Sequence, residues 1–176
     1  MTAEESLMAA RGEDASSRIV VGVHGTAASA AAVEWGAREA RLRGARLQLV
    51  LARDPTAACR AGYARGPAAA PGTAGGDWLS QTAAWAARML APEQVTAETA
   101  DGLPARVLMD RAIGACLLVL GAARTGDFIG PVARACLRQA PCPVVIIAAD
   151  HWRSAEVPAP RPVAAPVASM TGLTPR

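Results

Sequence analysis

The stretch Arg18-Ile-Val-Val-Gly-Val-His-Gly-Thr26 indicates the class of fold. Residues 18–23 contain a short, continuous apolar run, which is typical of a strand that is covered on both faces of a sheet. Thr26 predicts the N-cap of a helix, and Gly44 predicts the residue that ends this helix. A buried strand that is followed at once by a helix favours an α/β fold.

The rest of the chain repeats this unit of strand and helix. Further strands are predicted at 46–52, 95–99, 116–121 and 144–148, and further helices at 78–90, 102–114 and 131–140. The most hydrophobic run, 116–121, predicts the central strand, whereas 95–99 predicts an edge strand. Because strands and helices alternate and the turns are short, we expect an α/β fold with a five-stranded parallel, doubly wound sheet.

One folded domain is expected at residues 18–149. Residues 1–17 are small and polar and predict a mobile N-terminal arm. Residues 150–176 are rich in proline and predict an extended, disordered tail. Inside the domain, the Pro- and Gly-rich stretch 55–76 predicts a long loop, and loops of that length are usually functional or disordered.

The composition excludes several classes of protein. No apolar run approaches the roughly 20 residues of a membrane helix, so no membrane protein is expected. The acidic start, residues 1–6, leads into no apolar stretch, so no secretory signal is expected either. The net charge is only +3 and aromatic residues make up 3% of the chain, which argues against a nucleic-acid partner.

The cysteines favour a reducing compartment. They are Cys59, Cys116, Cys136 and Cys142. They form no C-x-x-C pair and have no histidine at the spacing of zinc ligands, so no metal site is predicted. We expect reduced, mostly buried thiols in a cytoplasmic protein.

Several segments carry a combined family signal. They are Arg18–Thr26, Trp35-Gly-Ala-Arg-Glu-Ala40, Gly102-Leu-Pro-Ala-Arg-Val-Leu108, Leu117-Leu-Val-Leu-Gly121 and Ala140-Pro-Cys-Pro-Val-Val-Ile-Ile147. Taken together and in this order, they resemble the universal stress protein family, and they span essentially the whole predicted domain. The resemblance implies the family's fold, a five-stranded parallel sheet of the adenine nucleotide α-hydrolase-like type, and a cytoplasmic location.

The resemblance also implies partners and a ligand. It implies a homodimer that pairs through the last strand, Val144 to Ala148. Many members of the family bind ATP without an efficient catalytic cycle. In doubly wound sheets, ligands bind beyond the carboxyl ends of the strands, where the strand order reverses, and residues 22–26 and 121–130 meet that description. The candidate cofactor-binding residues are Val23, His24, Ala52, Gly121, Arg124, Gly126, Gly130 and Val132.

The family's ATP motif is altered in this chain. ATP-binding members resemble Gly-x-x-Gly, then nine residues, then Gly-Ser or Gly-Thr, and the motif would begin here at Gly121. Arg124 stands in place of the second glycine, and His24 replaces an acidic residue. Ungapped counting puts Arg134 and Ala135 on the Gly-Ser pair, whereas alignment on Pro141-Cys-Pro-Val144 makes the loop too short and leaves the pair absent. Pro131 removes one N–H from the helix that would receive the phosphates. We therefore predict that ordinary ATP binding is weak or absent.

The sequence favours a protein that is not an enzyme. It has no Gly-x-Ser-x-Gly elbow, no lysine for a Walker motif and no cluster of metal ligands. We interpret the chain as a non-catalytic, cytoplasmic stress-response module for binding or signalling, with no cofactor. The alternative is an ATP-binding stress regulator in which Arg124 clamps a phosphate.

Two features of the sequence, a histidine and a group of arginines, each allow two interpretations. His24 could be a pH-sensitive ligand contact or a general base. The simpler interpretation is a turn residue whose imidazole bonds nearby backbone, because no Ser or Cys partner can be assigned to it. A group of arginines could bind an anion, although the spacing of Glu39 and Arg43 favours a solvated helix face. This group is Arg38, Arg41, Arg43 and Arg46.

Overall fold

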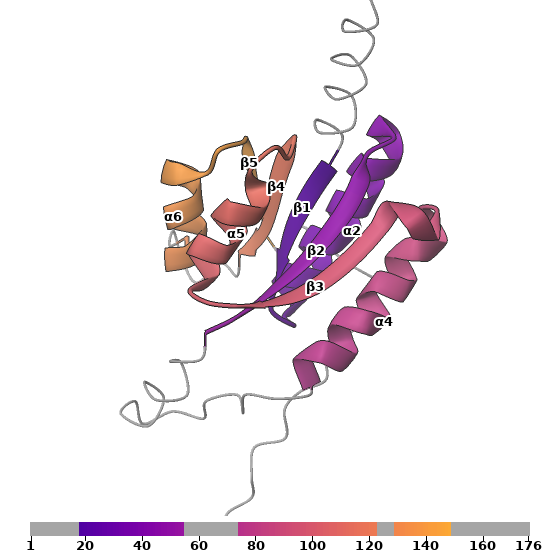
Figure 1. Ribbon diagram of the computed structural model, residues 1–176, viewed down its shortest axis with the longest axis horizontal. Helices are drawn as coiled ribbons and strands as arrows, with labels where there is room; N and C mark the ends of the chain where they lie inside the picture. The colour runs from indigo at the N-terminus through magenta and orange to yellow at the C-terminus, as the bar shows by residue number, and fades with distance from the viewer. Residues whose placement is uncertain (1–17, 55–73, 123–128, 149–176) are drawn as a thin grey trace, which may run out of the picture.

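The computed structural model describes residues 18–54, 74–122 and 129–148 (Figure 1). The predicted arm and tail lie outside the described residues, and so does the stretch 55–73 of the predicted loop. The described helices and strands fall between Arg18 and Ala148. None of the helices in this part of the chain combines the length and the apolar character needed to cross a membrane.

Five parallel strands form one sheet in the order β3-β2-β1-β4-β5, which confirms the predicted fold. The strands are β1 (Arg18–Val23), β2 (Arg46–Arg53), β3 (Val95–Asp101), β4 (Leu117–Ala122) and β5 (Val144–Ala148). β3 is an edge strand, as predicted. The prediction that 116–121 is the central strand was wrong, because the central strand is β1 and β4 lies beside it. Both strands are buried on both faces, so their hydrophobicity does not show which of them is in the middle of the sheet.

Two helices cover each face of the sheet. α2 (Ala27–Arg43) and α4 (Ala74–Met89) pack on one face, and α5 (Pro104–Ala112) and α6 (Pro131–Gln139) pack on the other (Figure 1). A short 3₁₀-helix, η1 (Pro92–Gln94), precedes β3. α4 begins earlier than the predicted start at Trp78, because Gly75 and Gly76 are poor helix formers that conceal its first turn.

The ends of α2 follow the sequence. The Thr26 side chain accepts a hydrogen bond from the Ser29 N–H and caps the first turn. Gly44 ends the helix in the left-handed region, with φ at 63°, a conformation that glycine adopts without steric cost. Both caps are confirmed, and they fix where the helix starts relative to the end of β1.

α2 lies unusually close to the sheet. A Cβ atom placed on Gly121 of β4 would come within 2.1 Å of the Ala28 carbonyl oxygen. A Cβ atom on Gly36 of α2 would come within 2.8 Å of the Val21 side chain. The helix is also rich in buried alanines, so its backbone packs almost directly on β1 and β4.

The first residue of β1 holds α5 in place. The Arg18 guanidinium donates to the carbonyl oxygen of Arg111 at 3.2 Å and to that of Ile113 at 2.7 Å. These carbonyls lie at the C-terminus of α5, where a cation also interacts favourably with the helix dipole, by about 0.3–1 kcal/mol at an exposed site. Arg18 thereby connects the start of the central strand to the helix above it.

The contact between Gly121 and α2 predicts a large difference between two glycines. Gly121→Ala would place a methyl group against a backbone carbonyl that cannot rotate away, and we expect it to lower the free energy of unfolding by about 3 kcal/mol. Gly130→Ala is the matched control, since φ is −57° there and no atom lies within 4 Å of the new Cβ. Because alanine is a poorer N-cap than glycine, we expect this variant to lose about 1 kcal/mol or less in urea unfolding, well below the loss in Gly121→Ala. Equal stability of the two variants would contradict the close packing of α2.

Candidate functional site

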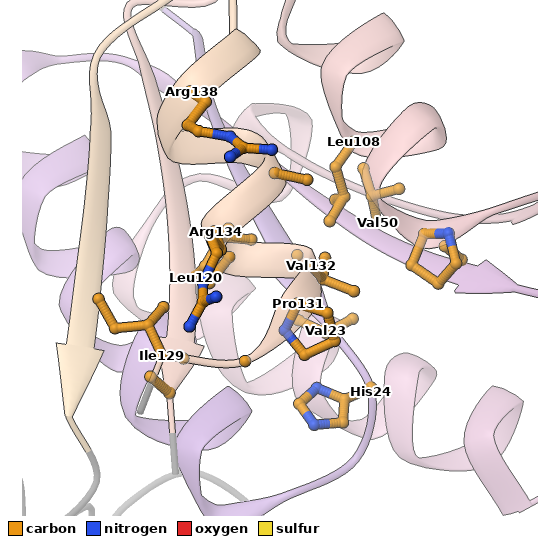
Figure 2. Close-up of a pocket in the computed structure, with 18 residues that line it drawn as sticks. Val23, His24, Val50, Leu108, Leu120, Ile129, Pro131, Val132, Arg134 and Arg138 are labelled. Atoms are coloured by element: carbon orange, nitrogen blue, oxygen red, sulfur yellow. The ribbon is translucent and has the colours of Figure 1, made fainter. Parts of the chain in front are cut away.

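A cavity of about 910 Å³ opens at the carboxyl ends of β1 and β4 (Figure 2). The chain leaves β1 toward β2 on one side, and β4 lies on the other side, so this is the point where the strand order reverses. α5 and α6 supply the remaining walls. The lining residues are Gly22, Val23, His24, Val50, Ala52, Pro104, Leu108, Leu120, Gly121, Ala122, Ile129, Gly130, Pro131, Val132, Ala133, Arg134, Ala135 and Arg138.

Most of the predicted site residues meet in this cavity. Those that line it are Val23, His24, Ala52, Gly121, Gly130 and Val132. Arg124 and Gly126 lie outside the described residues. The structure therefore brings together residues from β1, β2, β4 and α6, and a ligand contact by any of them stays a prediction.

Sequence reasoning missed the walls that α5 and α6 provide. Leu108 and Pro104 come from α5, and Arg134 and Arg138 come from α6. The signal was present in the helical spacing, because Arg134 and Arg138 lie about one and two turns after Pro131. Residues at this spacing share one face of a helix, here the face that borders the cavity.

His24 is held by two hydroxyl groups on the first turn of α2. Its ring Nδ1 lies 2.8 Å from Ser29 Oγ, and its Nε2 lies 3.2 Å from Thr26 Oγ1. Its backbone N–H also donates to Ser29 Oγ at 3.0 Å. The expectation of an imidazole that bonds backbone, with no serine partner, was wrong. The serine comes from the capping turn itself, so a search for a distant nucleophile could not find it.

This pair of serine and histidine is unsuited to nucleophilic catalysis. Ser29 is fully buried, so a substrate carbonyl cannot reach its Oγ. That oxygen also accepts the His24 N–H, which occupies part of its acceptor capacity. The arrangement instead fixes the imidazole at the edge of the cavity and joins the end of β1 to the start of α2.

The imidazole is neutral near pH 7. Burial of the ring against α2 lowers the pKa of His24 from its usual value. A neutral imidazole has one nitrogen that donates and one that accepts, which matches its two hydroxyl neighbours. His24 therefore adds no full charge to the cavity at this pH.

The start of α6 offers little to a phosphate. Gly130 is the N-cap and makes no side-chain cap bond, and Pro131 occupies the first turn without an N–H. The Arg134 N–H already donates to the Gly130 carbonyl at 3.0 Å. Gly130, Val132 and Ala133 keep N–H groups outside the helical ladder at this end, one fewer than a helix start without proline would offer.

The charge of the described lining is positive. Arg134 and Arg138 are its charged residues, and none of the residues that line the cavity carries a carboxylate. Groups of three or more side chains suited to hold a metal ion are absent from the part of the chain that the structure describes. The remaining lining is mainly aliphatic, with Val23, Val50 and Leu108 buried.

The arginines that could have bound an anion lie on the surface, and two of them form ion pairs on α2. Arg38, Arg41, Arg43 and Arg46 are exposed. Arg43 pairs with Glu39, as its spacing predicted, and Arg38 pairs with Glu34.

The cysteines within the described residues are free thiols. Cys136 is buried, whereas Cys116 and Cys142 are half-buried, and Cys59 lies outside the described residues. Burial raises the pKa of the Cys136 and Cys142 thiols, so both stay protonated near pH 7.

Comparison with known proteins gives one consistent result. The model of the Universal stress protein family matches residues 16–148. Universal stress protein UspA from Lactobacillus plantarum matches with a TM-score of 0.57 and 23% identity, over 74% of this chain and 97% of its own. A protein of the universal stress protein family from Burkholderia pseudomallei matches with a TM-score of 0.55 and 24% identity, over 76% of this chain and 96% of its own. A universal stress protein in complex with cAMP matches with a TM-score of 0.55 and 21% identity, over 76% of this chain and 98% of its own. The search of curated proteins found no match.

The lowered pKa of His24 predicts a pH dependence. Below about pH 6.5 the unfolded chain takes up a proton at His24 that the folded chain takes up only at lower pH, so stability falls as the pH drops through this window. His24→Gln removes this contribution and keeps groups that can bond both hydroxyls. We expect the variant to lose less Tm than the wild type between about pH 7 and pH 5. An identical loss of Tm in both proteins would contradict the lowered pKa of His24.

Proposed function

The chain belongs to the universal stress protein family, and from this we propose that it is a non-catalytic, cytoplasmic stress-response module that binds a small molecule or signals, with weak or no binding of ordinary ATP. The cytoplasmic location rests on the cysteine pattern, which favours a reducing compartment. The binding role rests on the cavity at the reversal of strand order.

One observation carries the proposal of weak ATP binding. The end of the cavity that would receive phosphates has a proline in the first turn of α6 and no hydroxyl on the lining residues from 129 to 135. A triphosphate with Mg²⁺ needs several backbone N–H groups, and the metal needs oxygen ligands. The described lining offers Mg²⁺ no carboxylate or hydroxyl.

Gly121 supports the same proposal. In a phosphate-binding loop, glycine lets the backbone approach the ligand. Here the space beside Gly121 is taken by the Ala28 carbonyl, so the packing of α2 alone accounts for this glycine.

The absence of catalysis is proposed from the state of the nucleophiles. Ser29 is buried beneath His24, and the pKa values of Cys136 and Cys142 are raised, so these groups are poor nucleophiles. A general base near pH 7 also needs a free nitrogen, and both ring nitrogens of His24 face hydroxyl groups of α2.

The alternative is an ATP-binding stress regulator in which Arg124 clamps a phosphate. Two findings favour keeping it as a second candidate. Arginines of α6 line the cavity, and one solved relative was determined in complex with cAMP. Guanidinium groups bind phosphate oxygens in pairs, so arginine could replace part of a glycine-rich loop.

Titration with ATP separates the two candidates. In isothermal calorimetry with and without Mg²⁺, we expect no saturable binding tighter than about 1 mM. Micromolar affinity that is lost in Arg124→Ala would contradict the proposal and support the alternative. Arg106→Ala is the control, because Arg106 is an exposed arginine of α5 that does not line the cavity.

We also propose a homodimer that pairs through β5. β5 is an edge strand of aliphatic residues, and an unpaired edge of this kind invites pairing with another chain. The Leu118 N–H donates to the Pro143 carbonyl at 2.9 Å. With Leu118 beside Val144 and Leu120 beside Ile146, this register directs the amides of Val144 and Ile146 away from β4.

Removal of a single backbone amide, that of Ile146, tests the proposed dimer. Ile146→Pro removes an outward N–H, and Ile146→Ala removes a comparable amount of side chain but keeps the amide. We expect sedimentation to give a dimer for the wild type and for Ile146→Ala at about 10 μM, and a dimer at least tenfold weaker for Ile146→Pro. A monomeric wild type, or equal dimers in both variants, would contradict pairing through this edge.

A further inference from the structure

The two arginines of the cavity differ from several other arginines of the fold. Arg38, Arg43, Arg53 and Arg111 each pair with a carboxylate, and Arg18 donates to backbone carbonyls. Within the described residues, Arg134 and Arg138 have no such partner. Both stand on the face of α6 that borders the cavity, one turn apart (Figure 2).

The rest of the cavity lining is mainly apolar and favours an apolar ligand. Its walls are aliphatic side chains from the sheet, α5 and α6, namely Val23, Val50, Ala52, Leu108, Leu120 and Val132. The lining includes no aromatic ring other than His24, so bases have little to stack on. Both nitrogens of this ring already face α2, which leaves few side chains to read the polar edge of a base.

We propose that this cavity binds an aliphatic organic anion, with the apolar body against Val50, Leu108 and Leu120 and a single anionic head at Arg138. The inference rests on the proposed binding function of the cavity and names its ligand class. In Figure 2, the Arg138 guanidinium points away from α6 in the direction of Leu108 of α5, whereas the Arg134 guanidinium points away from Arg138, toward Ile129. An anionic head at that place would meet positive charge with no carboxylate of the described lining to oppose it.

The size of the cavity agrees with this class. About 910 Å³ is near the upper end of the range for sites of small organic ligands, so the body of the ligand can be long or branched. A triphosphate would gain positive charge but no Mg²⁺ ligand from the described lining, whereas a single carboxylate, sulfonate or phosphate head is matched by the one guanidinium group of Arg138.

The first test compares two probes that differ in charge. The fluorophore 8-anilinonaphthalene-1-sulfonate has an apolar body and one anionic group, and N-phenyl-1-naphthylamine has the same body without the charge. We expect the sulfonate to bind the wild type at least about fivefold more tightly than the neutral probe, with an affinity that weakens as salt is added. Equal affinities of the two probes would overturn the proposal.

Variants locate the anionic head. We expect Arg138→Gln to weaken binding of the sulfonate about fivefold and Arg134→Gln to weaken it less, through the loss of nearby positive charge, and both to leave the neutral probe unchanged. Arg106→Gln and Arg41→Gln are matched controls, because both arginines are exposed and lie outside the cavity. An equal effect of the control variants, or no effect of the two α6 variants, would overturn the proposal.

Competition identifies the apolar body. Decanoate is expected to displace the sulfonate probe from the wild type, and to do so less well from Arg138→Gln. Displacement by AMP and not by decanoate would overturn the assignment of an aliphatic ligand. Tight displacement by ATP with Mg²⁺ would contradict the proposed weak ATP binding instead, so failure of the two proposals can be told apart.

Discussion

The direct backbone contact between α2 and β4 is the constraint on which the rest of the structure depends. Gly121 allows this contact, because any larger residue would meet the Ala28 carbonyl. Through it, the capping turn of α2 is held at the ends of β1 and β4, and Thr26 and Ser29 are placed where they bind His24. The same contact closes one side of the cavity, so ligand space remains only toward α5 and α6. A packing requirement between a helix and a sheet therefore decides where a ligand can lie.

This constraint also changes how the altered ATP motif is understood. Taken as sequence alone, Gly121 is the first residue of an altered phosphate-binding motif, with Arg124 in place of the second glycine. In the structure it is a packing residue, and the phosphate end of the cavity has a proline-initiated helix with few free N–H groups. Positive charge has not been lost, since it resides on two arginines of α6. The cavity thus lies where doubly wound sheets bind their ligands, and its arginines are the basis for the proposed anion in place of a Mg²⁺-bound triphosphate.

Most of the fold could be predicted because its signals are local. Continuous apolar runs marked β1 and β4, and Thr26 and Gly44 marked both ends of α2. The start of α4 could not be predicted, since glycines in a first turn look like loop. The cavity-lining residues that end or follow strands could be predicted, because the carboxyl ends of parallel strands lie at one edge of the sheet. Arg134, Arg138 and Leu108 were missed because they line the cavity only once α5 and α6 pack side by side. The contact of His24 with Ser29 depends on tertiary geometry at a cap, which spacing alone does not reveal.

The most direct test of this account follows the backbone amides around the cavity by NMR while Mg²⁺ and ATP are added. The account predicts that the amide signals of Gly121, Gly130, Val132 and Ala133 show no saturable shift up to millimolar nucleotide, because Gly121 faces α2 and the start of α6 offers few donors. Saturable shifts of these four amides at micromolar ATP would show that phosphates are held there, and would contradict it.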